Sequence, residues 1–324
     1  MDEKDFVDIS TEVAGLHLEY PIFNASGPLC TTERDLRDIG ESYSGAILSK
    51  SCTLVARSGN LEPRYKEFGD QQNSINSMGL PNLGYQEYTR ILPALKTYGK
   101  PVIASISGLT PEDSVVIAKS FNNTGIDAIE LNLSCPNVIG KPQIGYDFEA
   151  SRKLISKVTK VSGLPIGVKL PPFFDISHIK EMAGVLNNSG ISFVTCINSP
   201  GNGLVIDIET ESTVIHPREG FGGIGGPCIK PFGLANVRKF RELLDPKISI
   251  IGVGGICSGA DVFEYILCGA DAVQIGTCFM QKGTSAFKTL VCEFLEIVSE
   301  KGYRSVQEFK GKLKTTLPSP FPDS

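Results

Sequence analysis

The sequence predicts an α/β fold, a (β/α)8 barrel that forms a single domain over residues 1–324. Short runs rich in Val, Ile and Leu alternate with amphipathic runs of helical period, and eight such pairs occur along the chain. The strand-like runs are apolar on both faces, as expected of parallel strands covered by helices. Eight strand–helix units in 324 residues, with 41% apolar content, favour a closed barrel over an open doubly wound sheet.

The elements follow in chain order from local patterns. The predicted strands are residues 20–24, 45–49, 101–105, 127–132, 165–169, 192–197, 248–253 and 272–275. Apolar residues keep helical spacing over 176–186 and 287–298, and Thr110-Pro111 is typical of an N-cap followed by the first helical residue.

Three segments fall outside this alternation. Residues 201–226 are longer than a usual βα loop and contain the alternating runs "LVIDIE" and "STVI". They predict an inserted hairpin which, with a small N-terminal element, lies over the barrel mouth. The proline-rich stretch 317–324 is expected to be a disordered tail.

Composition excludes several classes of protein. The 31 basic and 36 acidic residues give a net charge of −5, which argues against a nucleic-acid or membrane partner. No apolar run approaches the roughly 18 residues of a spanning helix, and the acidic start lacks a secretory pattern. Nine cysteines without C-x-x-C indicate reduced thiols and a cytoplasmic protein, and three scattered histidines predict no metal site.

The carboxyl ends of the predicted strands carry the polar residues of the candidate site. In a barrel these ends converge on one face, where catalytic and ligand groups sit. The residues at the strand ends are Asn24, Ala25, Ser26, Gly27, Lys50, Ser51, Asn132, Lys169, Asn198, Ser199, Gly254, Gly255, Gly276 and Thr277.

Three groups of residues at the strand ends or in neighbouring loops indicate the kind of ligand that the site would bind. Glycines after the last two strands (Gly254, Gly255 and Gly276), with Gly225-Gly226, suit a phosphate, although tight turns also need glycine. Lys50 and Lys169 end apolar strands, where one lysine would ordinarily snorkel to solvent. Two lysines in one barrel mouth favour an anionic partner such as a phosphate and a reduced flavin ring. Asn76, Asn132, Asn137 and Asn198 suit a planar ligand such as a pyrimidine, although asparagine is also common in turns.

Cys135 lies in the polar stretch "ELNLSCPNVIGKPQ" that follows the fourth predicted strand. A free cysteine is usually a small buried apolar side chain, as we expect for Cys52, Cys196 and Cys268. A thiol on a polar loop can instead act as a base once its thiolate is favoured. None of the three histidines lies near a suitable strand end, so a general base is favoured over a Cys–His nucleophile.

Together these motifs resemble the dihydroorotate dehydrogenases, flavin-dependent barrels of pyrimidine biosynthesis. The similarity runs from about Phe23 to Phe309. The most specific stretches are "SKSCT", "NSINSMGLPN", "ELNLSCPNVIGKPQ", "GVKLPP", "NSPGNGL", "GFGGIGG" and "VQIGT". A cysteine at the base position, where class 2 relatives use serine, indicates soluble class 1. The loop "NVIGKPQ" resembles fumarate-using class 1A, which works as a homodimer without an iron–sulfur partner.

The resemblance implies FMN as cofactor, dihydroorotate and fumarate as substrates, and a role for each matching residue. Cys135 would be the general base, with Lys50 contacting both substrate and flavin. The other substrate-binding residues would be Asn76, Met78, Gly79, Leu80, Asn132, Asn137, Asn198 and Ser199. The cofactor-binding residues would be Ala25, Ser26, Gly27, Lys50, Ser51, Asn132, Lys169, Ile197, Gly226, Gly254, Gly255, Gly276 and Thr277.

Two alternatives stay open at this point. A class 1B subunit would pass electrons to NAD through an iron–sulfur partner. A flavin barrel that reduces uracil in transfer RNA is disfavoured by the acidic net charge and the lack of a basic appended domain. The chain departs from the class 1A pattern at Ile139, where many relatives have proline, and in a slightly longer segment at 69–73.

Overall fold

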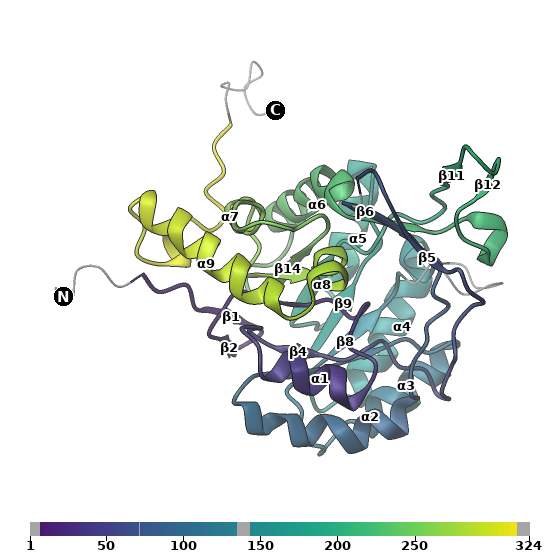
Figure 1. Ribbon diagram of the computed structural model, residues 1–324. Helices are drawn as coiled ribbons and strands as arrows, with labels where there is room; N and C mark the ends of the chain where they lie inside the picture. Colours follow the sequence, from purple (N-terminus) through teal and green to yellow (C-terminus); the bar gives the residue numbers. More distant parts are fainter. Residues whose placement is uncertain (1–6, 71, 135–142, 316–324) are drawn as a thin grey trace.

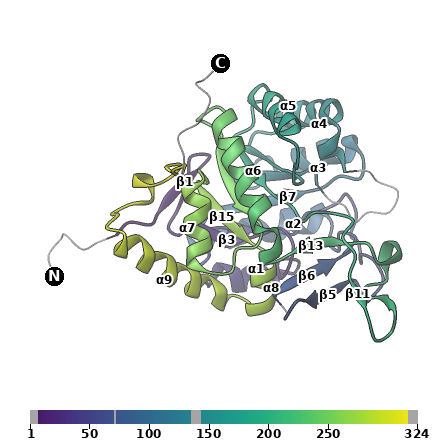
Figure 2. The same ribbon diagram turned by 90° about the horizontal axis from the view of Figure 1, so that it is seen from above.

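Eight parallel strands form the central sheet of the computed structural model, which describes residues 7–70, 72–134 and 143–315. They are β3 (Ile22–Asn24), β4 (Ile47–Leu48), β7 (Val102–Ile106), β8 (Ala128–Asn132), β9 (Ile166–Lys169), β10 (Phe193–Cys196), β14 (Ser249–Val253) and β15 (Ala272–Ile275). Their order is β3-β15-β14-β10-β9-β8-β7-β4. Each coincides with a predicted run to within three residues at either end, so the predicted barrel is confirmed (Figures 1 and 2).

The first two barrel strands, β3 and β4, are joined largely by a side chain. Asn24 Nδ2 donates to the backbone carbonyl of Leu48 at 2.7 Å, and Asn24 Oδ1 accepts from the Leu48 N–H at 3.1 Å. Beside this pair, Gly45 N–H donates to Ile22 O at 2.8 Å. A Cβ on Gly45 would lie 1.8 Å from Tyr20 O, so this close approach requires glycine. The buried amide of Asn24 therefore replaces backbone pairing where the sheet closes.

Helices surround the barrel and follow the strands in sequence (Figure 2). The α-helices are α1 (Glu33–Gly40), α2 (Tyr85–Ile91), α3 (Pro111–Ser120), α4 (Phe148–Val161), α5 (Ile176–Asn187), α6 (Lys230–Leu243), α7 (Gly259–Leu267), α8 (Thr277–Lys282) and α9 (Ser285–Glu300). The 3-10 helices are η2 (Leu92–Tyr98), η3 (Ile144–Tyr146), η4 (Pro217–Gly220), η5 (Pro227–Ile229) and η6 (Val306–Glu308). The predicted cap at Thr110 is confirmed, with Asp113 completing a capping box. Among the described residues, no helix has the length and apolar character needed to span a bilayer.

The amino-terminal end of the barrel is filled with apolar side chains. Phe23, Leu48 and Phe193 belong to one buried cluster there, together with Val13 and Leu18. The last two come from the antiparallel hairpin of β1 (Thr11–Val13) and β2 (Leu16–Leu18), which is the small N-terminal element. This hairpin thus packs against the barrel end opposite the mouth, so the predicted position of the N-terminal element over the mouth is wrong. The reason is that Val13 and Leu18 are apolar and cover the apolar side chains at the amino-terminal ends of the strands.

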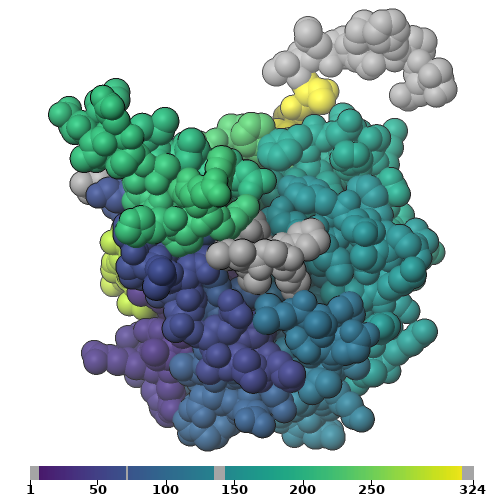
Figure 3. Space-filling view, turned by 90° about the vertical axis from the view of Figure 1, so that its right-hand side faces the viewer, coloured from purple at the N-terminus to yellow at the C-terminus, as the bar shows by residue number. Residues whose placement is uncertain are grey.

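The opposite end is roofed by a small antiparallel sheet. It has the order β13-β6-β5, formed by β5 (Tyr65–Phe68), β6 (Asn73–Asn76) and β13 (Gly223–Gly225). The predicted inserted hairpin exists as β11 (Ile206–Asp207) paired with β12 (Ser212–Thr213), but it projects from the body of the protein and does not lie over the mouth as predicted (Figure 1). Both strands are exposed, and the part of the insertion that covers the mouth is β13, which pairs with β6. Figure 3 shows this insertion, in green, beside the blue surface of the segment that contains β5 and β6.

The closure of the barrel by Asn24 can be tested by truncation. Asn24→Ala should lower the free energy of unfolding by about 2–4 kcal/mol, because two buried backbone groups of Leu48 lose their partner. Asn122→Ala is a matched control, since Asn122 also holds a carbonyl (Val161 O, 2.8 Å) and an N–H (Gly163, 2.8 Å) but is only half-buried. Urea titration measures both. Equal losses for the two variants would contradict a special role for Asn24.

Candidate active site

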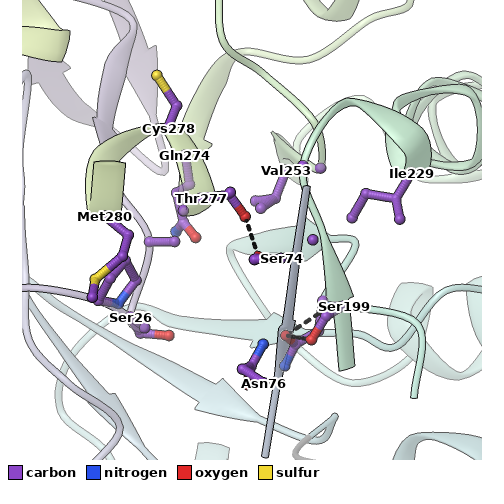
Figure 4. Close-up of a pocket in the computed structure, with 18 of the residues that line it drawn as sticks. Ser26, Ser74, Asn76, Ser199, Ile229, Val253, Gln274, Thr277, Cys278 and Met280 are labelled. Atoms are coloured by element: carbon purple, nitrogen blue, oxygen red, sulfur yellow. Dashed lines mark hydrogen bonds between the residues drawn. The ribbon is translucent and has the colours of Figure 1, made fainter. Parts of the chain in front are cut away.

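A pocket opens between the carboxyl ends of the barrel strands and the β13-β6-β5 sheet (Figure 4). Every described residue that the family resemblance assigned to substrate or cofactor lines it, whereas the strand-end residue Asn24 does not. The described residues so assigned are Ala25, Ser26, Gly27, Lys50, Ser51, Asn76, Met78, Gly79, Leu80, Asn132, Lys169, Ile197, Asn198, Ser199, Gly226, Gly254, Gly255, Gly276 and Thr277. Residues separated by up to 252 positions thus meet in one cavity, because the barrel brings all its strand ends to the same face.

Two pocket amides are held in fixed orientations by one buried serine. Ser134 donates its N–H and its hydroxyl to Asn132 Oδ1, at 3.0 and 2.9 Å. Asn198 Nδ2 donates to the same Ser134 hydroxyl at 2.8 Å, and Asn198 Oδ1 accepts from the Ser199 N–H at 2.8 Å. The Asn132 amide N–H2 therefore faces Ser51 Oγ, 3.1 Å away. Fixed donors and acceptors of this kind suit a ligand with its own pattern of N–H and C=O groups.

The two predicted lysines are both buried in the pocket wall. Lys50 Nζ donates to the Gly27 carbonyl at 2.5 Å, and Lys169 Nζ donates to Gln274 Oε1 at 3.1 Å. Lys169 is 4% exposed, and its burial lowers the pKa of its ammonium group, an effect that the negative charge of Glu130 opposes. An anionic ligand in the pocket would offset the same desolvation cost.

Glycines shape the wall where a phosphate is predicted. Gly226, Gly254 and Gly255 all have positive φ angles, of 95°, 127° and 71°. A Cβ on Gly255 would lie 2.9 Å from Gly226 O, so the two loops approach each other as backbone. By contrast, a Cβ on Gly276 would meet nothing nearer than Ala25 Cβ at 4.0 Å. At Gly276 the free space belongs to the pocket and is open to a ligand.

The roof contributes hydroxyl and amide groups to the same cavity. Ser74 on β6 and Thr277 share a hydrogen bond of 2.9 Å between their hydroxyls, drawn in Figure 4. Asn76 Nδ2 donates to Gly223 O on β13 at 3.3 Å. The slightly longer segment at 69–73 leads into β6, where Asn73 Oδ1 accepts from the Cys228 N–H at 3.0 Å. Asn73, at the end of this segment, therefore belongs to the roof.

Sequence reasoning missed three polar residues beneath the pocket: Glu130, Thr195 and Gln274. Thr195 Oγ1 and Gln274 Nε2 donate to Glu130 Oε2 at 2.9 and 2.8 Å. Gln274 also lines the pocket (Figure 4). A signal was present, because residues two apart on a strand point to the same side. Glu130 precedes the predicted site residue Asn132 by two positions, and Gln274 precedes Gly276 by two.

Among the described residues, no pocket thiol is prepared to act as a base. Cys52, Cys196 and Cys268 are buried as predicted, and burial raises the pKa of each. Cys257 and Cys278 line the pocket. Burial and the nearby Asp261 carboxylate raise the pKa of the Cys257 thiol to about 11, and burial raises the pKa of the Cys278 thiol. Such thiols are neutral near pH 7.

The predicted base Cys135 and the predicted ligand Asn137 lie outside the described residues. The residues that flank this stretch are described on both sides. Gln143, the last residue of the "GKPQ" motif, donates through Nε2 to the backbone carbonyl of Ser134 at 3.1 Å. The motif thus ends in contact with the serine that orients Asn132 and Asn198.

Comparison with known proteins gives consistent matches over most of the chain. The family model described as dihydroorotate dehydrogenase matches residues 8–298. A dihydroorotate dehydrogenase (fumarate) of Trypanosoma cruzi is 50% identical over 300 residues, 91% of this chain and 95% of the relative. The dihydroorotate dehydrogenase A (fumarate) of Lactococcus lactis is 47% identical over 311 residues, 95% of this chain and 99% of the relative. A third protein with the (fumarate) name, from Lachancea kluyveri, is 46% identical over 301 residues.

The open space at Gly276 gives a direct test of ligand binding. Gly276→Leu should fold normally but bind FMN at least about tenfold more weakly, because its Cβ meets no protein atom nearer than 4.0 Å and the rest of the side chain would extend into the pocket. Gly163→Leu is the control, since a Cβ there makes only an ordinary contact of 3.6 Å with Asn122 at the surface. Flavin fluorescence quenching measures affinity, and circular dichroism checks the fold. Wild-type affinity in Gly276→Leu would contradict this position for the cofactor.

Proposed function

The chain belongs to the dihydroorotate dehydrogenase family, and on this premise we propose that it oxidises dihydroorotate to orotate with fumarate as electron acceptor. The protein is an FMN-dependent oxidoreductase of pyrimidine biosynthesis, as the family identity establishes. The observation that carries the proposal is the single pocket, which collects every described residue that the family resemblance assigned to substrate or cofactor.

The residues of the pocket fit FMN. Gly276 leaves space where a side chain would intrude, and the backbone of Gly226 and Gly255 can approach a phosphate closely. Lys169 presents a buried ammonium group that suits a ring gaining negative charge. Bound FMN supplies the hydride acceptor for dihydroorotate and the hydride donor for fumarate.

The protein's own residues would hold and orient the substrate. Lys50 would neutralise the substrate carboxylate, and the amides fixed by Ser134 would pair with the N–H and C=O groups of the pyrimidine ring. Met78, Gly79 and Leu80 would add contacts from the loop after β6. Positioning of this kind shortens the distances over which the proton and the hydride move, and it lowers the entropic part of the activation free energy.

We assign the general base to Cys135. As thiolate it would take the proton from C5 of dihydroorotate while C6 loses hydride. In the second half-reaction the protonated thiol would return a proton to fumarate, which gives succinate and resets the base. Support comes from the sequence position directly after Ser134, which contacts the pocket amides of Asn132 and Asn198, and from the raised pKa values of the pocket thiols Cys257 and Cys278.

Fumarate is favoured as acceptor by the names of the relatives and by the "GKPQ" motif. The class 1B alternative, with NAD and an iron–sulfur partner, lacks such support.

We also propose that the protein works as a homodimer in the cytoplasm. The eight described cysteines are all unpaired, as in a reducing compartment, and Leu204, Ile206 and Ile208 expose apolar side chains suited to a subunit contact.

Replacing the proposed base should separate cofactor binding from chemistry. Cys135→Ala should keep FMN but slow flavin reduction by dihydroorotate by about 10²–10⁴-fold, because no group would remove the C5 proton. Cys292→Ala, which removes an exposed thiol on α9, should react like wild type. Stopped-flow bleaching of the flavin measures both rates. A wild-type rate in Cys135→Ala would remove the base assignment.

The acceptor can be identified on the purified chain alone. After anaerobic reduction by dihydroorotate, fumarate should reoxidise the flavin fully, whereas NAD and quinone should do so poorly. We expect this preference because the pocket that binds the carboxylate of dihydroorotate would also bind fumarate, a small dicarboxylate. Rapid turnover with NAD that requires an added iron–sulfur subunit would instead favour class 1B.

A further inference from the structure

A carboxylate lies inside the barrel directly beneath the pocket. Glu130 is fully buried in the middle of β8, and its side chain points into the barrel on the same face as Ala128 and Asn132. Glu130 Oε1 accepts from Ser26 Oγ at 3.2 Å, and Oε2 accepts from Thr195 and Gln274. No step of the proposed reaction uses this group.

The hydrogen bonds link this carboxylate to the pocket lysine. The Lys169 ammonium can only donate, so Gln274 must turn its oxygen toward Lys169 (3.1 Å). The Gln274 N–H2 group then faces Glu130 Oε2 at 2.8 Å. The resulting chain runs from carboxylate to amide to ammonium, and its last member lines the pocket.

Burying a carboxylate destabilises the folded state through lost hydration, unless hydrogen bonds and an opposite charge compensate for that loss. An apolar side chain would fill the same place in the barrel without that cost. Lys169 is the partner, although a whole amide separates the two charges. Glu130 therefore offsets part of the positive potential that Lys169 directs into the pocket.

We propose that Glu130 is a positioning residue that orients Lys169 through Gln274 and, by its negative charge, limits how strongly the pocket stabilises reduced FMN. This inference rests on the proposed function, because it needs the cofactor beside Lys169. A cofactor held too firmly in its reduced form would accept hydride readily but pass it on slowly. Glu130 thus balances the dihydropyrimidine half-reaction against the fumarate half-reaction.

The test is the reduction equilibrium of bound FMN, measured against redox dyes without either substrate. Glu130→Gln keeps the size and polarity of the side chain but removes its charge. It should favour the reduced state by about tenfold, a rise of about 30 mV for a two-electron couple. In stopped-flow experiments, reduction by dihydroorotate should become faster and reoxidation by fumarate slower.

Asp271→Asn is the matched control. Asp271 is also a buried carboxylate, bound to the Ile250 N–H and to Lys310 Nζ at 2.7 Å each, but it directly precedes β15 at the opposite end of the barrel. The control should lose stability and keep the wild-type reduction equilibrium. An equal shift in both variants, or a shift below about twofold in Glu130→Gln, would overturn the proposal.

A second variant tests the proposal in case Glu130→Gln does not fold. Glu130→Met replaces the carboxylate by an apolar side chain of similar length that needs no hydrogen-bond partner, and it should shift the equilibrium in the same direction. If neither variant folds with FMN, Glu130 is a structural residue and the proposal is wrong. Failure of the proposed function would be visible separately, as wild-type protein that binds no FMN or does not oxidise dihydroorotate.

Discussion

The two hydrogen bonds between the Asn24 amide and the backbone of Leu48 hold together the edges of the eight-stranded sheet. Only a closed barrel brings the strand that ends at Asn24 and the strand that ends at Asn132 to face the same cavity. Asn24 also directly precedes Ala25, Ser26 and Gly27, which line the pocket. The closure of the fold and the first wall of the site are therefore built by consecutive residues.

The interior of the barrel is divided into an apolar layer and a polar layer by the two-residue period of its strands. Phe193 and Thr195 point inward from β10, and the parallel register places them beside Gly167 and Lys169 of β9. A Cβ on Gly167 would lie 2.0 Å from the Phe193 ring, so glycine there makes room for the aromatic side chain. The lower layer supplies burial, and the upper layer, with Glu130, Lys169 and Gln274, supplies charge and hydrogen bonds at the base of the pocket.

The polar side chains that line the pocket are held in place by the protein itself. Ser134 fixes the orientation of Asn132 and Asn198, so the hydrogen-bond pattern is present before a ligand arrives. Lys50 and Lys169 are both buried in the wall, where their charges act through little solvent. Such a rigid, charged wall suits small carboxylates, and both dihydroorotate and fumarate are small carboxylates.

The sequence by itself determined the eight strands, the helices between them and the residues at the strand ends, because apolar periodicity and strand-end position are local properties. Glu130, Gln274 and the closing role of Asn24 were decided by the tertiary structure. Each depends on which distant residue the register places opposite: Gln274 meets Glu130 across 144 positions, and Asn76 meets Gly223 across 147. A polar side chain in an apolar run shows that a partner is needed, but only the folded barrel decides which partner it has.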